Sequence, residues 1–141
     1  MEVKVRNNAR AIIIEHDSIL LLQYHFQQLE EKKTVWVAPG GGLEVGEDFE
    51  DALVRELREE LNIVNASIGE CVWVKEATYK YSDGTPFLSY EKYYFVDLPK
   101  DAQITLEHME KNERENTLKY KWWSLKELKE SKEEFFALDI Y

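Results

Sequence analysis

The feature that most limits how this chain can fold is the stretch 48–61, in which apolar and acidic residues repeat with helical spacing. Asp48 can cap this helix, and Asp51 stands three residues later, where a capping box takes an acid. Asn62 suits the left-handed position that ends a helix. The sequence therefore predicts one helix over 48–61. Before it, the Pro-Gly-Gly-Gly segment at 39–42 should end the preceding strand.

Two arcs of this helix differ in character. Glu56, Glu59 and Glu60 share an arc of about 100°, and the neighbouring arc should dock on a sheet through Leu53, Val54, Leu57 and Leu61. Acids at these spacings repel by a few tenths of a kcal/mol per pair. A bound cation between them would explain the arc, and so would a solvated acidic face like that at 126–134. Oxygen ligands without histidine or thiolate favour Mg²⁺ or Mn²⁺ over zinc.

The rest of the chain predicts strands around this helix. Runs rich in β-branched, aliphatic and aromatic residues lie at 9–15, 18–26, 36–37, 63–75, 88–98 and 120–123. Turns are expected at 16–17 and 82–84, and the charged segment 100–116 reads as a loop or a poorly packed turn. Ser124 should cap a final helix running to about Phe136. This mixture predicts an α/β layer fold on a mixed sheet, in a single domain over 1–141 without repeats.

Composition limits the partners of the chain. Its 28 acidic and 18 basic residues give a formal net charge of −10, which argues against a nucleic-acid polymer as partner. An anionic phosphate ligand would then need a divalent cation to hold it. No apolar run reaches the ~20 residues of a membrane helix, and no secretory signal opens the chain. Cys71 is the single cysteine, so no internal disulfide is expected and a cytoplasmic location is predicted.

The spacing around the helix carries a family resemblance. The order reads Gly41-x5-Glu47-x7-Arg55-Glu56-Leu57-x-Glu59-Glu60-x-Asn62-Ile63, and it resembles the signature of the Nudix hydrolases. The family has glycine where this chain has Asn62, but asparagine is the next-best residue at positive φ, so the helix can still end there. Two weaker similarities flank the signature, in the Trp-x-x-Pro-Gly-Gly order at 36–41 and the Trp-Trp-Ser-Leu-x-Glu-Leu order at 122–128.

The resemblance implies a Nudix-type α/β/α sandwich in which the signature forms a loop–helix–loop. It also implies Mg²⁺-dependent hydrolysis of a phosphoanhydride bond in a nucleoside diphosphate derivative, with nucleoside triphosphates as the leading subclass and Mn²⁺ as the alternative ion. The partner would be a nucleotide-type small molecule, and a homodimer is common in such folds. The alternatives are a catalytically inactive nucleotide sensor, which would have little need of all three glutamates, and an acidic interaction domain, which leaves the spacing unexplained.

The resemblance also assigns roles to single residues. Glu56, Glu59 and Glu60 would hold the metal, and the backbone carbonyl of Gly40 would complete its shell, although a simple tight turn explains that glycine equally well. Arg55 would pair with the glutamates and hold their rotamers. Glu47 either faces the same metal cluster or pairs with Arg55, and its charge also suits a helix N-terminus.

The general base stays open between two glutamates. Family members use either a glutamate of the signature or one from a downstream loop, which makes Glu59 and Glu115 the candidates. Glu113 and Glu110 follow closely, and any of these loop acids can equally be plain solvated charges.

Several residues are candidates for contacting the nucleotide. Tyr79, Tyr81, Tyr90, Tyr93 and Phe95 could stack on a base, but strand alternation explains them as core residues or cross-strand pairs. In the family, a tyrosine 16 residues past the signature accompanies dinucleoside polyphosphate hydrolysis, and Tyr79 stands there. Arg10 could meet a phosphate or pair with a surface acid, and His25 and His108 are expected to be satisfied or exposed rather than to be ligands.

Overall fold

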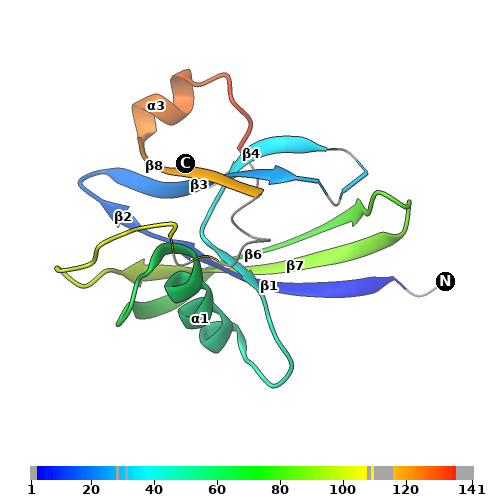
Figure 1. The fold of residues 1–141 in the computed structure, drawn as a ribbon, viewed down its shortest axis with the longest axis horizontal. Helices are drawn as coiled ribbons and strands as arrows, with labels where there is room; N and C mark the ends of the chain where they lie inside the picture. Colours follow the sequence, from blue (N-terminus) through cyan, green and yellow to red (C-terminus); the bar gives the residue numbers. More distant parts are fainter. Residues whose placement is uncertain (1–2, 28, 31, 108, 110–115, 136–141) are drawn as a thin grey trace.

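A computed structural model of the chain describes residues 3–27, 29–30, 32–107, 109 and 116–135. Within these residues, strands form two sheets, and two helices lie at opposite sides of the strands (Figure 1). The strands are β1 (Lys4–Ile12), β2 (Ile14–Glu15), β3 (Ser18–Phe26), β4 (Lys33–Val37), β5 (Gly40–Gly42), β6 (Ser67–Lys80), β7 (Pro86–Asp97) and β8 (Thr117–Ser124). The helices are α1 (Phe49–Leu61) and α3 (Leu125–Glu130). The expected mixed α/β class is confirmed.

The first sheet has the strand order β5-β1-β7-β6 and is mixed. Strand β1 runs parallel to β7 and antiparallel to the short β5. Strands β6 and β7 form a long antiparallel hairpin, and its turn lies at the expected place, with Gly84 at φ +87°. Because side chains alternate along a strand, every second residue of β1 and β7 projects from the same face of this sheet, and so does every second residue of β6 after the register shifts between Ile68 and Trp73.

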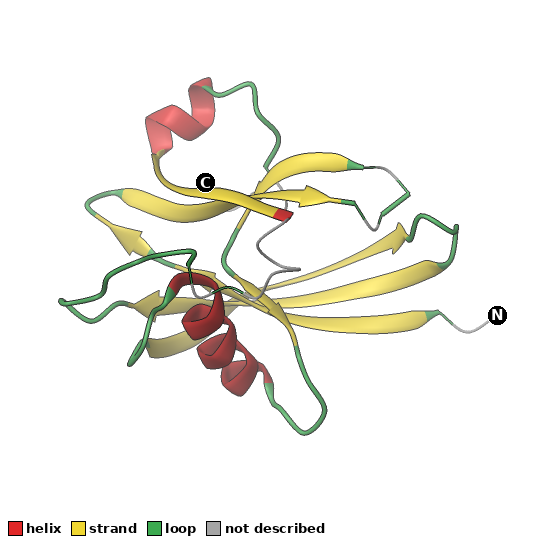
Figure 2. Cartoon of the chain, in the orientation of Figure 1, coloured by secondary structure: helices red, strands yellow, loops and turns green. Residues whose placement is uncertain are grey.

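The second sheet is antiparallel around β3, which pairs with β2, β4 and β8. In Figure 2, in the orientation of Figure 1, β3, β4 and β8 lie above the strands of the first sheet. Trp36 and Trp123 pack edge to face in this sheet with ring centroids 5.0 Å apart, and Leu128 of α3 belongs to the same buried cluster. Strand β8 and helix α3 therefore pack on β4 through one buried apolar cluster.

Helix α1 forms as the sequence predicts. Asp48 accepts a hydrogen bond from the amide of Asp51 at 2.8 Å, the reciprocal bond completes the capping box, and Asn62 closes the helix at φ 59°. Three leucines are fully buried in the larger core cluster, and burying a leucine stabilises the fold by about 1.5–3 kcal/mol; they are Leu53, Leu57 and Leu61. The expectation that Val54 also docks is wrong, because Val54 is 44% exposed and Ala52 is buried in its place.

Several element bounds differ from expectation. Strand β1 begins at Lys4 rather than at residue 9, because its polar first half pairs with β7, a long-range contact that local propensity does not reveal. Strand β6 begins at Ser67 rather than at 63, since Asn65 has a positive φ of 59°. The glycines at 40–42 form a short edge strand beside β1, and the chain bends at Pro39.

Two expectations near the C-terminus also change. Helix α3 ends at Glu130, because Ser131 adopts an extended conformation, and Phe136 lies outside the described residues. The described part of the charged segment 100–116 packs on the core rather than loosely. Ile104 and Leu106 contact the larger cluster, and the amide of Thr105 bonds to the carbonyl of Leu61 at 3.1 Å. No described helix has the length and apolarity that crossing a membrane would require.

Candidate active site

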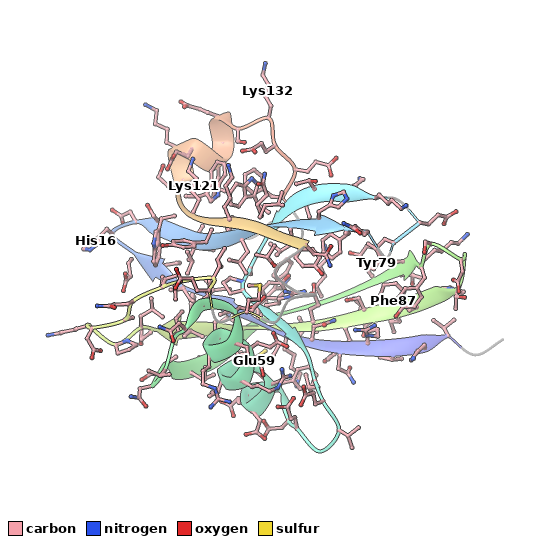
Figure 3. The ribbon with its side chains drawn as sticks, viewed as in Figure 1. His16, Glu59, Tyr79, Phe87, Lys121 and Lys132 are labelled. Atoms are coloured by element: carbon pink, nitrogen blue, oxygen red, sulfur yellow. The ribbon has the colours of Figure 1, made fainter. Side chains whose placement is uncertain are left out.

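A cavity of about 270 Å³ is lined by both sheets and by α1. One end of this cavity is formed by acidic side chains of α1 and β7 together with the glycines of β5, and we call it the carboxylate end: Glu56, Glu60, Glu91, Gly40, Gly41 and Gly42. The other end is formed by rings from β3 and from the tip of the β6–β7 hairpin, and we call it the aromatic end: Tyr24, Phe26, Tyr79, Tyr81 and Phe87. In Figure 3, the label of Glu59 marks α1 beside the carboxylate end, and those of Tyr79 and Phe87 mark the aromatic end.

The three helix glutamates do not share one environment. Glu56 and Glu60 are buried, with 6% and 8% of their surface exposed, and both line the cavity. The side chain of Glu59 is 30% exposed. Buried carboxylates are costly without charged or hydrogen-bonding partners, so the neighbours of Glu56 and Glu60 determine whether this arrangement is stable.

Arg55 supplies much of that compensation. Its Nη1 donates to Glu56 Oε1 at 3.0 Å and to Glu59 Oε2 at 3.2 Å. Its Nη2 donates to the carbonyl oxygen of Gly42 at 2.9 Å. The expected pairing of Arg55 with the helix glutamates is therefore present, and the planar guanidinium fixes several oxygens at once.

Glu47 forms a two-pronged ion pair with Arg55. Arg55 Nε donates to Glu47 Oε2 at 2.8 Å and Nη2 donates to Oε1 at 3.0 Å, while the amide of Glu44 also donates to Oε1 at 2.7 Å. These bonds, with that of Arg55 first, lower the pKa of Glu47, and the bond to Glu47 is the main reason that the pKa of Arg55 lies above its ordinary value. Of the two roles expected for Glu47, pairing with Arg55 is thus present, whereas metal binding stays a prediction.

Two glycines make the approach of β5 to α1 possible. The amide of Gly40 donates to Glu60 Oε1 at 2.9 Å, and Gly40 has φ +141°, where a Cβ would overlap the carbonyl oxygen of Ala9. A Cβ on Gly41 would lie 2.6 Å from the carboxyl carbon of Glu56. The Glu56 side chain therefore occupies space that only glycine at 41 leaves open, and glycine at 40 lets β5 lie against the backbone of β1.

The carboxylates are not gathered around one point. Among the described residues, no three histidine, cysteine, aspartate or glutamate side chains form a group that could hold an ion as they stand. Glu56 and Glu59 are turned toward Arg55, whereas Glu60 is turned toward the amide of Gly40. The predicted ligand set is close together on one helix, but its oxygens have separate partners.

A buried ion pair lies beside the glutamates. Arg10 Nε donates to Glu91 Oε2 at 2.9 Å, and the hydroxyl of Tyr93 donates to Glu91 Oε1 at 3.2 Å. Burial alone would lower the pKa of Arg10, but the charge of Glu91 keeps it above the ordinary value. The expectation that Arg10 pairs with a surface acid is therefore half right. Arg10 pairs with an acid, Glu91, but Glu91 is buried, with 3% of its surface exposed.

The aromatic end is built from rings on opposite sheets. Tyr81 stacks on Phe87 with ring centroids 4.4 Å apart, and Tyr24 packs edge to face on Phe26 at 4.6 Å. Burial, and then the charge of Glu91, raises the pKa of Tyr79 to about 12, so its hydroxyl stays protonated at neutral pH. Arg6 Nη1 donates to the hydroxyl of Tyr81 at 2.8 Å.

The five candidate stacking residues separate into two groups. Tyr79 and Tyr81 line the cavity. The others do not: Tyr90 packs against Phe49, Tyr93 is buried in the smaller cluster, and Phe95 is 49% exposed.

Some candidates fall elsewhere or cannot be placed. Glu115, Glu113, Glu110 and His108 lie outside the described residues. The imidazole Nδ1 of His25 lies 2.9 Å from the Thr34 hydroxyl on the exposed surface, away from the cavity lining.

Several cavity residues were missed by reading the sequence. Glu91, Tyr24, Phe26 and Phe87 line the cavity but were not singled out. Alternation in β7 carried a usable signal, since Phe87, Ser89, Glu91 and Tyr93 occupy every second position and are all buried. An acid in such an inward-facing series indicates a buried polar partner.

The NUDIX domain family model matches residues 4–141 of the chain. The chain belongs to the Nudix hydrolase family. The RNA pyrophosphohydrolase of Sulfurovum sp. is 34% identical to this Nudix hydrolase over 110 residues, which are 74% of this chain and 70% of the relative.

Solved structures agree with the Nudix fold. The solution structure of the E. coli ORF135 protein is 26% identical, with a TM-score of 0.64, and the match covers 90% of this chain and 79% of that one. A C. elegans Ap4A hydrolase is 25% identical, with a TM-score of 0.61, over 87% of this chain and 82% of that one. As a member of this family, the chain is a hydrolase of the class that acts on nucleoside diphosphate derivatives.

Proposed function

We propose that this Nudix hydrolase uses Mg²⁺, or Mn²⁺ in its place, to hydrolyse a phosphoanhydride bond in a nucleotide, with nucleoside triphosphates as the leading substrates. One observation carries the proposal: a single cavity has buried carboxylates at one end and aromatic rings at the other. A nucleotide has the same two-part chemistry, because its phosphates need cationic neutralisation and its base offers a flat π-face.

The residues present fit a hard divalent cation. Glu56 and Glu60 offer carboxylate oxygens to the cavity, Glu59 lies on the same turn of α1, and Gly41 lets the Glu56 carboxylate lie directly against β5. Such an ion would neutralise the phosphate oxygens and lower the pKa of a bound water. We assign these three glutamates as its ligands, with the carbonyl of Gly40 and the carboxylate of Glu47 as further candidates.

Arg55 has a positioning role in this proposal. It holds Glu56 and Glu59 through Nη1 while Glu47 fixes its other edge. Glu56 and Glu59 would have to turn partly from Arg55 to share an ion, and Arg55 then limits how far their carboxylates move. Partners of metal ligands typically contribute 10–100-fold to affinity or activity.

The proton acceptor for the attacking water is assigned to Glu59 or Glu115. The side chain of Glu59 is 30% exposed and on the same helix face as the other glutamates, so water can reach it. Alanine variants of both residues decide the question. A normal kcat and pH–rate profile in both variants would remove both candidates.

The aromatic end supplies the base site in this proposal. A ring inserted between the Tyr81–Phe87 pair and the Tyr24–Phe26 pair would stack on side chains from both sheets. Stacking tolerates any base, which leaves the choice of base to polar groups at the cavity wall, such as Asn8 and Ser89.

A substrate panel tests the proposal. The purified protein should hydrolyse at least one member of a panel of nucleoside triphosphates, a dinucleoside tetraphosphate and a 5′-triphosphorylated oligonucleotide, and only when Mg²⁺ or Mn²⁺ is added. The oligonucleotide is included because a relative carries the name RNA pyrophosphohydrolase. The dinucleoside tetraphosphate is included because a similar structure carries the name Ap4A hydrolase. Absence of turnover for every member with either ion would overturn the proposal.

Matched variants assign the activity to the cavity. Glu56→Gln and Glu60→Gln should each lower kcat by more than about 10²-fold, because losing a ligand exceeds the 10–100-fold effect typical of a ligand's partner. Glu50→Gln is the control, since Glu50 is an exposed acid on the same helix. Equal activity in all three variants would show that the reaction does not depend on the cavity-lining glutamates of this helix.

A further inference from the structure

Arg10 is a cavity-lining cation that the proposed chemistry leaves without a role. It lies near the C-terminal end of β1, directly paired with Gly40 of β5. Its side chain is 14% exposed. A largely buried arginine beside a carboxylate cluster requires a specific set of partners, which here can be followed atom by atom.

The first partner is an acid on the neighbouring strand. Arg10 Nε donates to Glu91 Oε2 at 2.9 Å, and Tyr93 donates to the other oxygen of Glu91 at 3.2 Å. With 3% of its surface exposed, Glu91 is too deeply buried to lack a cationic partner without large cost. The orientation of the Arg10 guanidinium is therefore fixed from the β7 side.

The second set of partners belongs to the corner between β4 and β5. Arg10 Nη1 donates to the carbonyl oxygens of Ala38 and Gly40, both at 3.2 Å. The amide of Ala11 also bonds to the carbonyl of Pro39, at 2.8 Å. Successive carbonyls of this corner are thus tied to β1, and two of them depend on one guanidinium nitrogen.

The corner in turn holds a carboxylate of α1. The amide of Gly40 donates to Glu60 Oε1 at 2.9 Å. Gly40 has a φ of +141°, which side chains other than hydrogen do not tolerate here. This amide shares its planar peptide unit with the Pro39 carbonyl, which the Ala11 amide holds, and Arg10 holds the carbonyls of the peptide units on either side. The direction of the Gly40 amide, and with it the position of the Glu60 oxygen, therefore depends on all three peptide units of this corner.

We propose that Arg10 is a positioning residue of the metal site: held by Glu91, it fixes the corner at 38–40 so that the Gly40 amide presents the Glu60 carboxylate to the cavity. The inference rests on the proposed function in one respect, that Glu60 is a metal ligand. It differs from a phosphate-binding role, because two of the three guanidinium nitrogens are already bound to protein groups.

Metal binding without nucleotide provides the direct test. Mn²⁺ affinity is measured by isothermal titration calorimetry for the wild type, Arg10→Met and Arg10→Lys. Both variants should bind Mn²⁺ about 10–100-fold more weakly, with the lysine variant less affected, because it keeps the charge but loses the planar fork. In steady-state assays kcat should fall by a similar factor while KM for the nucleotide changes little.

Arg6→Lys is the matched control. Arg6 projects from the same face of β1 and lines the same cavity, but its Nη1 bonds to the Tyr81 hydroxyl. Its replacement should leave Mn²⁺ affinity unchanged. Should Arg10→Met fail to fold, as circular dichroism would reveal, Arg10→Lys and Glu91→Gln decide the question. The neutral amide at 91 binds the guanidinium less strongly and should weaken Mn²⁺ binding in the same direction.

The other outcomes are distinct. A normal Mn²⁺ affinity with a raised KM in the Arg10 variants would make Arg10 a phosphate contact and overturn the inference. Normal values of both would also overturn it, while metal-dependent turnover by the wild type would leave the proposed function standing. Failure of the wild type itself to bind Mn²⁺ and to hydrolyse any nucleotide would instead remove the proposed function, and this inference with it.

Discussion

The two ends of the cavity are built in opposite ways. The carboxylate end is largely local in sequence, since α1 and the preceding glycines contribute Glu56, Glu60 and the groups around Arg55 within about one signature length. The aromatic end combines β3 with the tip of the β6–β7 hairpin, whose residues are far apart along the chain. The first region is therefore specified by spacing, and the second by the packing of two sheets.

The two ends also differ in how their side chains are held. Arg55 alone donates hydrogen bonds to four residues at or next to the carboxylate end, so a change there should affect several side chains together. At the aromatic end, ring contacts join Tyr81 to Phe87 and Tyr24 to Phe26, and Arg6 donates a hydrogen bond to the Tyr81 hydroxyl. We expect changes at the carboxylate end to act mainly on kcat and metal affinity, and changes at the aromatic end mainly on KM.

The largest effect in this comparison is expected for Arg55→Lys. Lysine keeps the charge but cannot reproduce the fork that joins Glu47, Glu56 and Glu59. We expect kcat and Mn²⁺ affinity to fall by about 10–100-fold, measured by steady-state kinetics and calorimetry. Arg58→Lys, at an exposed position on the same helix, is the control. Equal behaviour of the two variants would show that the Arg55 network does not hold the ligands.

A smaller effect is expected for Gly41→Ala. The new Cβ would lie 2.6 Å from the carboxyl carbon of Glu56, so this flexible side chain must move while the backbone can stay. We expect a roughly 10-fold loss of Mn²⁺ affinity, in the range for disturbed ligand positioning, with little change in the melting temperature. Gly42→Ala is the control, because its Cβ would meet Asn8 Oδ1 at an ordinary 3.5 Å. A loss of stability without a loss of affinity would contradict the prediction.

The opposite pattern is expected for Tyr81→Leu at the aromatic end. Removing the ring stacked on Phe87 should raise KM about 5-fold, corresponding to the lower part of the 1–3 kcal/mol range of base stacking, and should leave kcat nearly unchanged. Tyr120→Leu, on β8 and outside the cavity lining, is the control. A fall in kcat with constant KM would show that the two ends do not divide the work as proposed.

The same contrast explains what could be predicted from the sequence. The helix, its caps and the pairing of Arg55 with the glutamates follow from spacing within one segment, and the structure contains them. Glu91 and Phe26 were missed because their roles depend on which strands become neighbours and which faces meet. Arg10 shows both sides, since its pairing with an acid was anticipated but the burial of that acid was not.

Metal binding by Glu47 and the identity of the base remain predictions for different reasons. Glu47 has both oxygens engaged by Arg55, so its alternative role depends on an ion competing with that pair. Glu115 lies outside the described residues, and only the functional variants can place it. Local spacing can nominate such residues, but it does not decide between two partners for one carboxylate.

The smallest expected effect concerns the pH dependence of stability. The bond from Arg55 lowers the folded-state pKa of Glu47 below the ordinary value of 4.5. A carboxyl with a lowered folded-state pKa stabilises the fold above its unfolded-state pKa, and this contribution is lost as the pH falls through the folded-state pKa. The free energy of unfolding of the wild type should therefore exceed that of Glu47→Gln at pH 7, and the difference should shrink below about pH 4.5.

Urea titrations of both proteins between pH 7 and 3 measure this difference. Its pH-dependent part should be absent when the same pair is compared in an Arg55→Met background. A difference that is constant across this range would mean that Glu47 contributes through packing and hydrogen bonding rather than through its charge, and the carboxylate end would then be held mainly by the bonds of Arg55 to α1.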